Sequence, residues 1–410
     1  MSLKILEKLN TIPAMTKNYI LFDDNRRDNL LPLTFTRPVS EIRIGILTIT
    51  EKWKHYLGNG CSYLTSEYLS EKYPTNTTDT EFLLINGGVC PDKNLVNAIL
   101  KLKAGDALIS EDCVIAGVLR SVPKGNPCIS DFYNTTIYNQ DVLQILNPWD
   151  IFRLNGEAIQ HDFQILTSER KSELLSSTNT ALNPSQIFIE KGAKVECSIL
   201  NAETGPIYIG KDAEVMEGSI IRGPFALCEH SALKMGAKVY GPTTIGPHSK
   251  VGGEVNNSVI FGYSNKAHDG FLGNSVIGEW CNIGADSNNS NLKNNYAEVK
   301  LWNYQKKGFA KTGLQFCGLI MGDHSKCGIN TMFNTGTVIG VSANIFGSGF
   351  PRNFVPSFSW GGAAGFSIYQ TSKAFETAEI VMSRRDIKLT DIDKKILCHI
   401  FDITQEFRNF

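Results

Sequence analysis

A six-residue repeat in the second half of the sequence limits the possible folds more than any other feature. From residue 209 onward, every sixth position is branched aliphatic or leucine: Ile209, Val215, Ile221, Leu227, Leu233, Val239, Ile245 and Val251. Neither the 3.6-residue period of a helix nor the alternation of a simple strand produces a strict period of six. One short strand plus a tight turn does, if three hexads close one triangular coil. The repeat therefore predicts a parallel β-helix with the aliphatic side chains inside.

Two interruptions divide this repeat. It breaks at about residues 262–274, resumes at Ile277, breaks again through 288–318 and returns from Met321 to Ile345. We expect two loops to leave the prism at these places, and loops on a rigid scaffold often carry function. The β-helix is expected to span residues 187–350 with roughly seven coils.

The regions on either side of the repeat have a different texture. Residues 19–22 and 81–88 look like short buried strands and residues 95–103 like a helix, which predicts an α/β domain over residues 15–167. Residues 168–186 lack hydrophobic periodicity and are expected to be a linker. In residues 351–410, two amphipathic helices are expected at 371–385 and 390–408, capping the prism end or a neighbouring subunit. Residues 1–14 are set apart as an extension.

Charge and composition exclude several classes of protein. Forty basic and 41 acidic residues leave a formal charge of -1, which favours neither nucleic acid nor an anionic membrane as a partner. No apolar run is long enough to span a membrane, and the first residues do not resemble a signal peptide. The ten cysteines form no CxxC pair, so we expect reduced thiols in a soluble cytoplasmic protein.

The segment 265–278, NKAHDGFLGNSVIG, followed by CNIGA at 281–285, carries a family resemblance. It resembles the bifunctional N-acetylglucosamine-1-phosphate uridyltransferase/glucosamine-1-phosphate acetyltransferases and related archaeal sugar-1-phosphate nucleotidyltransferases. The resemblance implies a Rossmann-like α/β nucleotidyltransferase domain, a left-handed hexapeptide β-helix, and a homotrimer with acyl sites between subunits. It implies His268 as the base of acetyl transfer from acetyl-CoA. The acyl and sugar pocket would contain Asn256, Phe271, Ala285, Asn291 and Lys293.

The chemistry of acetyl transfer fits a histidine. An amine must lose its proton to attack a thioester, and histidine titrates near neutral pH. This chain departs from the family at Asn256, where a phosphate-binding lysine is usual, and at Phe271, where an aromatic hydroxyl is usual. The sugar phosphate would then be held by another lysine, for which the candidates are Lys238, Lys266 and Lys293. Arg352 and Lys306–Lys307 are candidates for the phosphates of coenzyme A, or are solvated surface cations.

The nucleotide site also departs from the family. The first strand leads into residues 23–38, DDNRRDNLLPLTFTRP, instead of a glycine-rich loop. Guanidinium groups bind phosphate well, so Arg26, Arg27 and Arg37 are expected to converge on one cleft at the carboxyl ends of parallel strands. The structural alternative is a loop in which they form salt bridges to Asp23, Asp24 and Glu41.

The expected metal site is displaced. Gly87–Gly88, preceded by the candidate nucleotide-binding residue Asn86, stands where the family has a Gly-Asp pair with a metal-binding carboxylate. A Mg²⁺ site for nucleotidyl transfer is then either moved, for instance to Asp92 or Asp162, or absent.

Three functional hypotheses follow. In the first, a bifunctional transferase makes a nucleotide sugar, such as UDP-N-acetylglucosamine, from a nucleoside triphosphate and a sugar 1-phosphate, and acetylates an amino sugar phosphate. In the second, only acetyl transfer remains and the N-terminal domain binds nucleotide or is architectural. In the third, the β-helix is a trimeric binding scaffold without chemistry. The sugar, the nucleotide base and the acceptor group, amine or hydroxyl, stay open at this stage.

Overall fold

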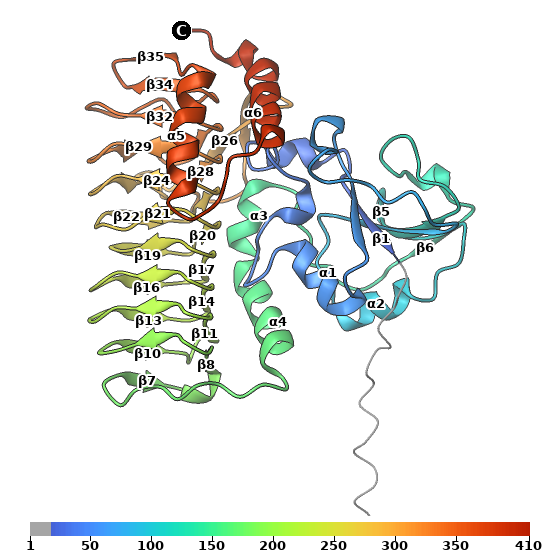
Figure 1. Cartoon of the computed structure of the whole chain (residues 1–410), viewed down its shortest axis with the longest axis horizontal. Helices are drawn as coiled ribbons and strands as arrows, with labels where there is room; N and C mark the ends of the chain where they lie inside the picture. Colours follow the sequence, from blue (N-terminus) through green and yellow to red (C-terminus); the bar gives the residue numbers. More distant parts are fainter. Residues whose placement is uncertain (1–17) are drawn as a thin grey trace, which may run out of the picture.

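The computed structural model describes residues 18–410 and shows an α/β domain beside a long β-solenoid (Figure 1). The expected start of the first domain at residue 15 lies outside the described residues. Two C-terminal helices lie along the side of the solenoid (Figure 1). The predicted order of an α/β domain, a parallel β-helix and C-terminal helices is confirmed.

The N-terminal domain is built on a six-stranded mixed sheet with the order β2-β1-β3-β5-β4-β6. Its strands are β1 (Tyr19–Phe22), β2 (Cys61–Leu64), β3 (Phe82–Asn86), β4 (Asp106–Ser110), β5 (Cys113–Leu119) and β6 (Asn134–Ile137). Its helices are α1 (Ile49–Leu57), α2 (Lys93–Ile99), α3 (Pro148–Arg153) and α4 (Asn155–Thr167). β1 pairs in parallel with both β2 and β3, which lie on opposite sides of it. The order in which strands are added to the sheet therefore reverses at β1.

The solenoid is a prism with three facets. The first facet contains β7 (Thr180–Leu182), β10 (Ile199–Asn201), β13 (Ile220–Arg222), β16 (Lys238–Tyr240), β19 (Glu254–Asn256) and β22 (Phe271–Gly273). The second contains β8 (Ile187–Ile189), β11 (Ile207–Ile209), β14 (Phe225–Leu227), β17 (Thr243–Ile245), β20 (Val259–Ile260), β23 (Val276–Ile277), β28 (Leu319–Met321), β31 (Thr337–Ile339) and β33 (Phe354–Val355). The third contains β9 (Lys194–Val195), β12 (Glu214–Val215), β15 (Ala232–Leu233), β18 (Lys250–Val251), β21 (Asn265–Lys266), β24 (Asn282–Ile283), β29 (Lys326–Cys327), β32 (Asn344–Ile345), β34 (Ser359–Gly362) and β35 (Gly365–Ile368).

The hexad residues fill the interior of the prism, as the period predicts. Val215, Ile221 and Leu227 are all buried in one apolar core that runs through the coils. The solenoid has about ten coils and not roughly seven. It is longer because β7 lies within the expected linker, β33 and β34 lie beyond residue 350, and the first interruption does not interrupt the coil.

Residues 262–274 do not leave the prism, contrary to the prediction. β21 pairs with β18 and β24, and β22 pairs with β19, so this segment forms an ordinary coil. The hexad changes phase because the corner at 252–253 is two residues shorter than the four-residue corners at 234–237 and 267–270. The missing residues shift the phase without ending the helix.

The second predicted loop does leave the prism. After β25 (Asn288–Asn289), which pairs with β30 (Met332–Phe333), the chain forms a hairpin of β26 (Lys300–Asn303) and β27 (Gly308–Lys311) and returns at β28. The hairpin reaches the N-terminal domain, where Gln305 Nε2 donates to the Asn25 carbonyl at 3.3 Å and Tyr304 packs edge-on against Phe35.

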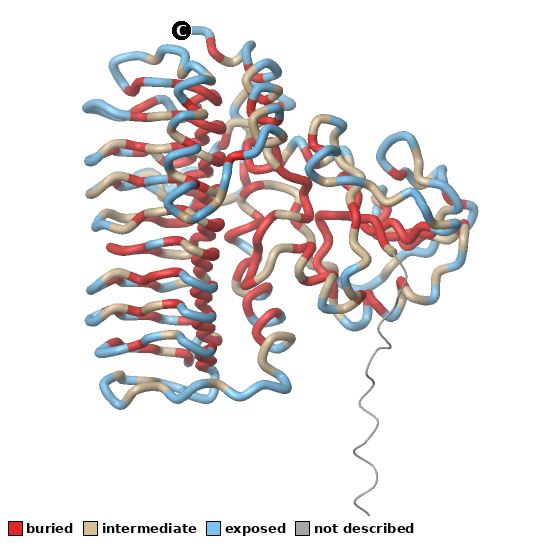
Figure 2. The backbone as a smooth tube through the Cα atoms, in the orientation of Figure 1, coloured by how far each residue is buried: buried red, intermediate tan, exposed pale blue. Residues whose placement is uncertain are grey.

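The second facet is buried on both sides. Its outward residues Phe188, Tyr208 and Ala226 pack with Ile159 and Phe163 of α4. Figure 2 shows the result as a continuous buried column along the edge of the solenoid that faces α3 and α4. The N-terminal domain is therefore held against the length of the prism.

The corner between the second and third facets carries a ladder of stacked rings. Successive coils place His230, His248, Tyr263, Trp280 and His324 there with positive φ between 56° and 62°. Neighbouring rings lie nearly parallel, with centroids 4.2 to 6.4 Å apart. We call these five residues the corner ladder.

The C-terminal helices bridge the prism and the N-terminal domain, and do not cap the prism end. They are α5 (Thr371–Ser383) and α6 (Asp391–Ile403). His399 of α6 stacks on Tyr68, and Lys395 of α6 pairs with Glu71 at 2.8 Å. Within residues 18–410, no helix is both long and apolar enough to cross a bilayer.

Candidate functional site

A groove of about 670 Å³ runs across the outer face of the third facet, beneath α5. Tyr263 and Trp280 of the corner ladder bound it at one side, and His268 and Ala285 bound it at the other. We call it the His268 groove. His268 is exposed and follows β21, at the corner between the third and first facets.

The His268 groove is strongly basic. Four of its lining side chains are cations: Lys250, Lys326, Arg384 and Arg385. No residue that lines it is Asp or Glu. A concave surface with one sign of charge concentrates ligands of the opposite sign, so this groove favours a polyanion of small-molecule size.

The other predicted pocket residues lie on the first facet, away from this groove. Asn256 in β19 pairs with Gly273 in β22. A Cβ at Gly273 would lie 2.5 Å from the ring of Phe271 and 2.6 Å from the side-chain nitrogen of Asn291, so both side chains close over this glycine. Asn291 also donates to Asn274 at 2.8 Å. The structure thus brings Phe271 and Asn291 together, separately from His268 and Ala285.

The lysine and arginine candidates for phosphate are scattered. Lys266 points into the prism, and only 3% of its surface is exposed. Lys293 donates to the Glu298 carbonyl at 2.8 Å, and Lys307 pairs with Glu406 at 2.6 Å. Lys238 and Arg352 are exposed, but neither lines the His268 groove. The basic residues that do line it were missed in the sequence, because Arg384 and Arg385 lie more than 100 residues beyond His268.

Asp24, Arg26, Asn86 and Cys113 form a polar cluster where β1 and β3 end. Arg26 Nε and Asn86 Nδ2 donate to Asp24 Oδ2 at 2.8 and 2.9 Å, and the Cys113 sulfur lies 3.4 Å from Asn86 Nδ2. Burial opposes the charge of Asp24, but the hydrogen bonds from Arg26 and Asn86 outweigh it and lower its pKa. Burial raises the pKa of the Cys113 thiol to about 11.

The three arginines do not share one cleft. Arg27 is buried, pairs with Asp23 at 3.1 Å and donates to the Tyr68 hydroxyl at 2.9 Å. Arg37 turns away to the solenoid. Of the three carboxylates expected as salt-bridge partners, Asp24 pairs with Arg26 and Asp23 with Arg27, whereas Glu41 accepts from the Tyr63 hydroxyl. Nucleotide binding by these residues stays a prediction.

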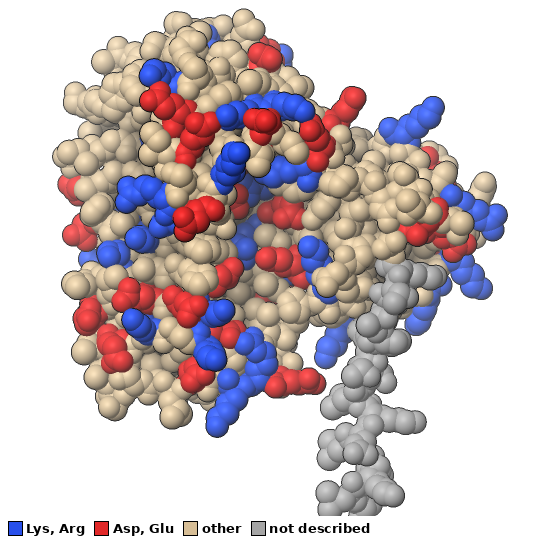
Figure 3. All heavy atoms as spheres, in the orientation of Figure 1, with Lys and Arg blue, Asp and Glu red and all other residues tan. Residues whose placement is uncertain are grey.

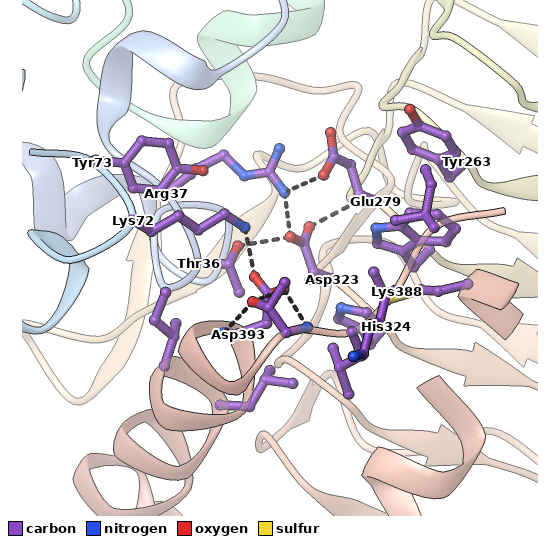
Figure 4. Close-up of a pocket in the computed structure, with 17 residues that line it drawn as sticks. Thr36, Arg37, Lys72, Tyr73, Tyr263, Glu279, Asp323, His324, Lys388 and Asp393 are labelled. Atoms are coloured by element: carbon purple, nitrogen blue, oxygen red, sulfur yellow. Dashed lines mark hydrogen bonds and ion pairs between the residues drawn. The ribbon is translucent and has the colours of Figure 1, made fainter. Parts of the chain in front are cut away.

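Arg37 lies in a pocket of about 360 Å³ where the two domains and the C-terminal helices meet (Figure 4). Its guanidinium pairs with Asp323, and with Glu279 at 3.2 Å. Thr36 donates to the same Asp323 carboxylate at 2.7 Å. Burial opposes the charge of Arg37, but Asp323 and Glu279 outweigh it and raise its pKa. Across the pocket, Lys72 pairs with Asp393 at 2.9 Å (Figure 4).

The residues suggested as a moved metal site have structural roles. Asp92 caps α2 by accepting from the Leu95 amide at 2.8 Å. Asp162 is buried, pairs with Lys52 and accepts from the Ile46 amide at 2.7 Å. Across residues 18–410, no three His, Cys, Asp or Glu side chains gather as metal ligands. Around Asp24, a Mg²⁺ ion would not fit without displacing Arg26, whose charge repels it.

The surface charge is mixed elsewhere. On the face seen in Figure 3, acidic and basic side chains alternate over both domains. This distribution is in keeping with the formal charge of -1. The His268 groove is therefore a local concentration of positive charge and not part of a basic surface.

Comparison with known proteins identifies the N-terminal part of the chain. Residues 19–171 match the family model of sugar nucleotidyl transferases. This part of the chain is a sugar nucleotidyl transferase domain, followed by a hexapeptide β-solenoid.

Parts of the chain have distant homologues. The chain is 28% identical over 262 residues to the bifunctional sugar-1-phosphate nucleotidylyltransferase/acetyltransferase of Sulfurisphaera tokodaii, over 62% of this chain and 58% of that protein. It is 34% identical over 87 residues to the bifunctional protein GlmU of Methanocaldococcus jannaschii, over 21% of each. The chain thus matches little more than half the length of the first relative. A solved Arabidopsis UDP-N-acetylglucosamine acyltransferase aligns over 52% of this chain and 80% of its own, with 15% identity and a TM-score of 0.20.

Proposed function

We propose that the chain is a bifunctional transferase of nucleotide-sugar formation. The solenoid transfers an acetyl group from acetyl-CoA to an amino sugar phosphate at the His268 groove. The N-terminal domain joins a nucleoside triphosphate to a sugar 1-phosphate and releases pyrophosphate. Support comes from the family of residues 19–171 and from the homologue whose name states both activities.

The charge of the His268 groove is the observation that carries the acetyl-transfer proposal. Coenzyme A carries several phosphate charges on an elongated body. The groove offers Lys250 and Arg384 without an opposing carboxylate, and it places His268 at its rim. Lys326 and Arg385 add positive charge while also donating to the His324 and His248 carbonyls. Phosphates bound by these cations would leave the thioester near His268.

In the proposed reaction, neutral His268 accepts a proton from the acceptor amine as the amine attacks the thioester carbonyl. The carbon–nitrogen bond forms and the carbon–sulfur bond breaks, and the leaving thiolate takes the proton from His268. Backbone amides near Ala285 and the amide of Asn291 would stabilise the oxyanion. Because Asn291 lies on another facet, it would come from an adjacent subunit.

The test compares two histidines. General-base catalysis contributes about 10² to 10⁴ in rate, so His268→Ala should lower acetyl transfer by that order. His230→Ala, on the exposed part of the corner ladder, is the matched control and should leave transfer unchanged. Equal transfer by H268A and the unchanged protein would show that His268 is not the base.

The nucleotidyl reaction is proposed at the cluster of Asp24, Arg26 and Asn86. β2 and β3 lie on opposite sides of β1, and ligands of open α/β sheets bind at such a switch point beyond the carboxyl ends of the strands. A panel of sugar 1-phosphates and nucleoside triphosphates, assayed for pyrophosphate release with and without Mg²⁺, tests this. Arg26→Gln should abolish release without affecting acetyl transfer.

A second function, acetyl transfer with an architectural N-terminal domain, is favoured by one observation. All three arginines expected to bind nucleotide form internal ion pairs, and the pair of Arg37 with Asp323 holds the domain to the solenoid. Acetyl transfer without pyrophosphate release for any triphosphate would support this function. If the unchanged protein shows neither activity, the remaining hypothesis is a trimeric binding scaffold without chemistry.

A homotrimer completes the proposal. The first facet exposes Ile199, Ile220 and Tyr240 by 39% to 48%, although these are apolar or aromatic side chains. The same facet carries Phe271 and Asn291, so packing of a second copy there would bring the two groups of pocket residues together. Light scattering should show a trimer, and Ile220→Glu should shift it to monomer with loss of acetyl transfer.

A further inference from the structure

Lys266 occupies a position that the fold reserves for an aliphatic side chain. It lies in β21, where its register partner in the preceding coil is Val251. The adjacent interior residue of the next coil is Ile283. Its exposed fraction is 3%. A charged side chain inside an apolar prism is costly unless its hydrogen bonds are satisfied, so its presence requires an explanation beyond packing.

The ammonium group reaches back to the corner that bears His268. Lys266 Nζ donates to the carbonyl oxygen of His268 at 2.6 Å. Burial lowers the pKa of Lys266 to about 8, and the nearby charges of Asp269 and Asp286 partly oppose this. At neutral pH the group is therefore mainly a cation, and it makes a charge-assisted hydrogen bond to the backbone.

The corner at 267–270 has four residues, like the corners at 216–219 and 234–237. Its Asp269 and Gly270 carbonyls accept from the Asp286 and Glu254 amides of the adjacent coils. Within residues 18–410, the His268 carbonyl accepts from Lys266 alone. Inside the prism, no strand pairing holds residues 267–270, because β21 ends at Lys266 and β22 begins at Phe271. Lys266 is the side chain that ties the His268 backbone to the interior.

We propose that Lys266 is a positioning residue for acetyl transfer, which holds the backbone of the corner at 267–270 so that the His268 ring faces the groove. This rests on the proposed function of His268. Lys266 itself touches no substrate. Its contribution is to limit the positions of the imidazole, and small misplacements of a catalytic group cost up to about 100-fold in rate.

The first experiment separates positioning from folding. Lys266→Met keeps the length and volume of the side chain but loses the donor. We expect kcat of acetyl transfer to fall about 10- to 100-fold, while KM for acetyl-CoA stays within about twofold, because the cations of the groove are unchanged. Leu233→Met, in the same interior column two coils earlier, is the control and should change neither. Unchanged kcat in K266M would overturn the proposal.

A double-variant cycle shows whether Lys266 acts through His268. If it does, K266M combined with H268A should transfer acetyl groups no more slowly than H268A alone. If the two losses multiply, Lys266 acts independently of His268 and the proposal is wrong.

Hydrogen exchange gives a readout that does not need activity. K266M should speed exchange of the Glu254 and Asp286 amides, which donate to the Gly270 and Asp269 carbonyls of the corner, and should leave the more distant coils protected. Unchanged exchange there refutes the positioning role. If the unchanged protein transfers no acetyl group, the proposed function fails, and the exchange result still decides whether Lys266 holds the corner.

Discussion

Replacing Lys266 by methionine should make the protein more stable at neutral pH, although the residue is buried. The reason is the cost of its charge. Burial lowers the pKa of Lys266 from 10.5 to about 8, so the folded state disfavours the protonated form. One pKa unit corresponds to about 1.36 kcal/mol, which gives a penalty of about 3 kcal/mol while the group is protonated in both states.

The penalty depends on pH in a defined direction. Below pH 8 it is fully present. Between pH 8 and 10.5 the folded protein releases the proton before the unfolded chain does, so stability rises with pH. Methionine removes the penalty but leaves the His268 carbonyl unpaired, at a cost of about 1–3 kcal/mol. K266M should therefore be about 1 kcal/mol more stable near pH 7 and about 2 kcal/mol less stable near pH 10.5.

Urea denaturation followed by circular dichroism, with both proteins measured side by side, gives this difference. Tyrosines and cysteines also titrate in this range, but they are common to both proteins and cancel. Leu233→Met should show a difference that does not vary with pH. A K266M difference that is constant from pH 7 to 10.5 would refute the reasoning, because the ammonium would then carry no burial penalty.

Three further outcomes are expected. Asp323→Asn should lower the unfolding free energy by about 3–5 kcal/mol, measured by urea denaturation, because it leaves the buried Arg37 without its closest counter-charge; no loss would mean that the pair does not hold the domains together. Arg384→Ser with Arg385→Ser should raise KM for acetyl-CoA about tenfold in steady-state assays, less at high salt, and an unchanged KM would place coenzyme A elsewhere. Leu233→Ala should lower the unfolding free energy by about 2–5 kcal/mol, and with it the melting temperature. A smaller loss would show that neighbouring interior side chains move to fill the cavity.

The solenoid was predictable because its contacts are periodic in the sequence. Each interior residue meets the residue one coil away, so Ile221 and Val239 face inward for the same reason. The prediction was wrong at residues 262–274, because an interior lysine and the shift of phase after the short corner at 252–253 resemble the end of the repeat. The lysine at position 266 and the shift of phase can both be seen in the sequence. The strand pairing that keeps this segment in the coil cannot be seen in a single sequence.

The sites were less predictable, because their contacts join distant parts of the chain. The pair of Arg37 with Asp323 spans 286 residues, and neither residue type reveals its partner. Glu279 and Asp323 are carboxylates at equivalent positions of the repeat. Each directly follows an apolar residue and a glycine, Ile277–Gly278 and Met321–Gly322. That position, next to the corner ladder, is the one signal in the sequence that could have indicated an interface.

Residues 168–186, expected to be a linker, pack against the solenoid. Within that segment, Arg170 pairs with Glu190 of the solenoid and β7 joins the first facet, so it is part of the prism. Residues 23–38 contain Asp24 of the polar cluster and also Arg37, whose side chain is fixed to the solenoid through its ion pair with Asp323. Tyr263 and Trp280 line both the interdomain pocket of Figure 4 and the His268 groove. Because the pair of Arg37 with Asp323 is buried and charged, it fixes the end of this segment against the solenoid, one residue from Trp280 through the second partner Glu279.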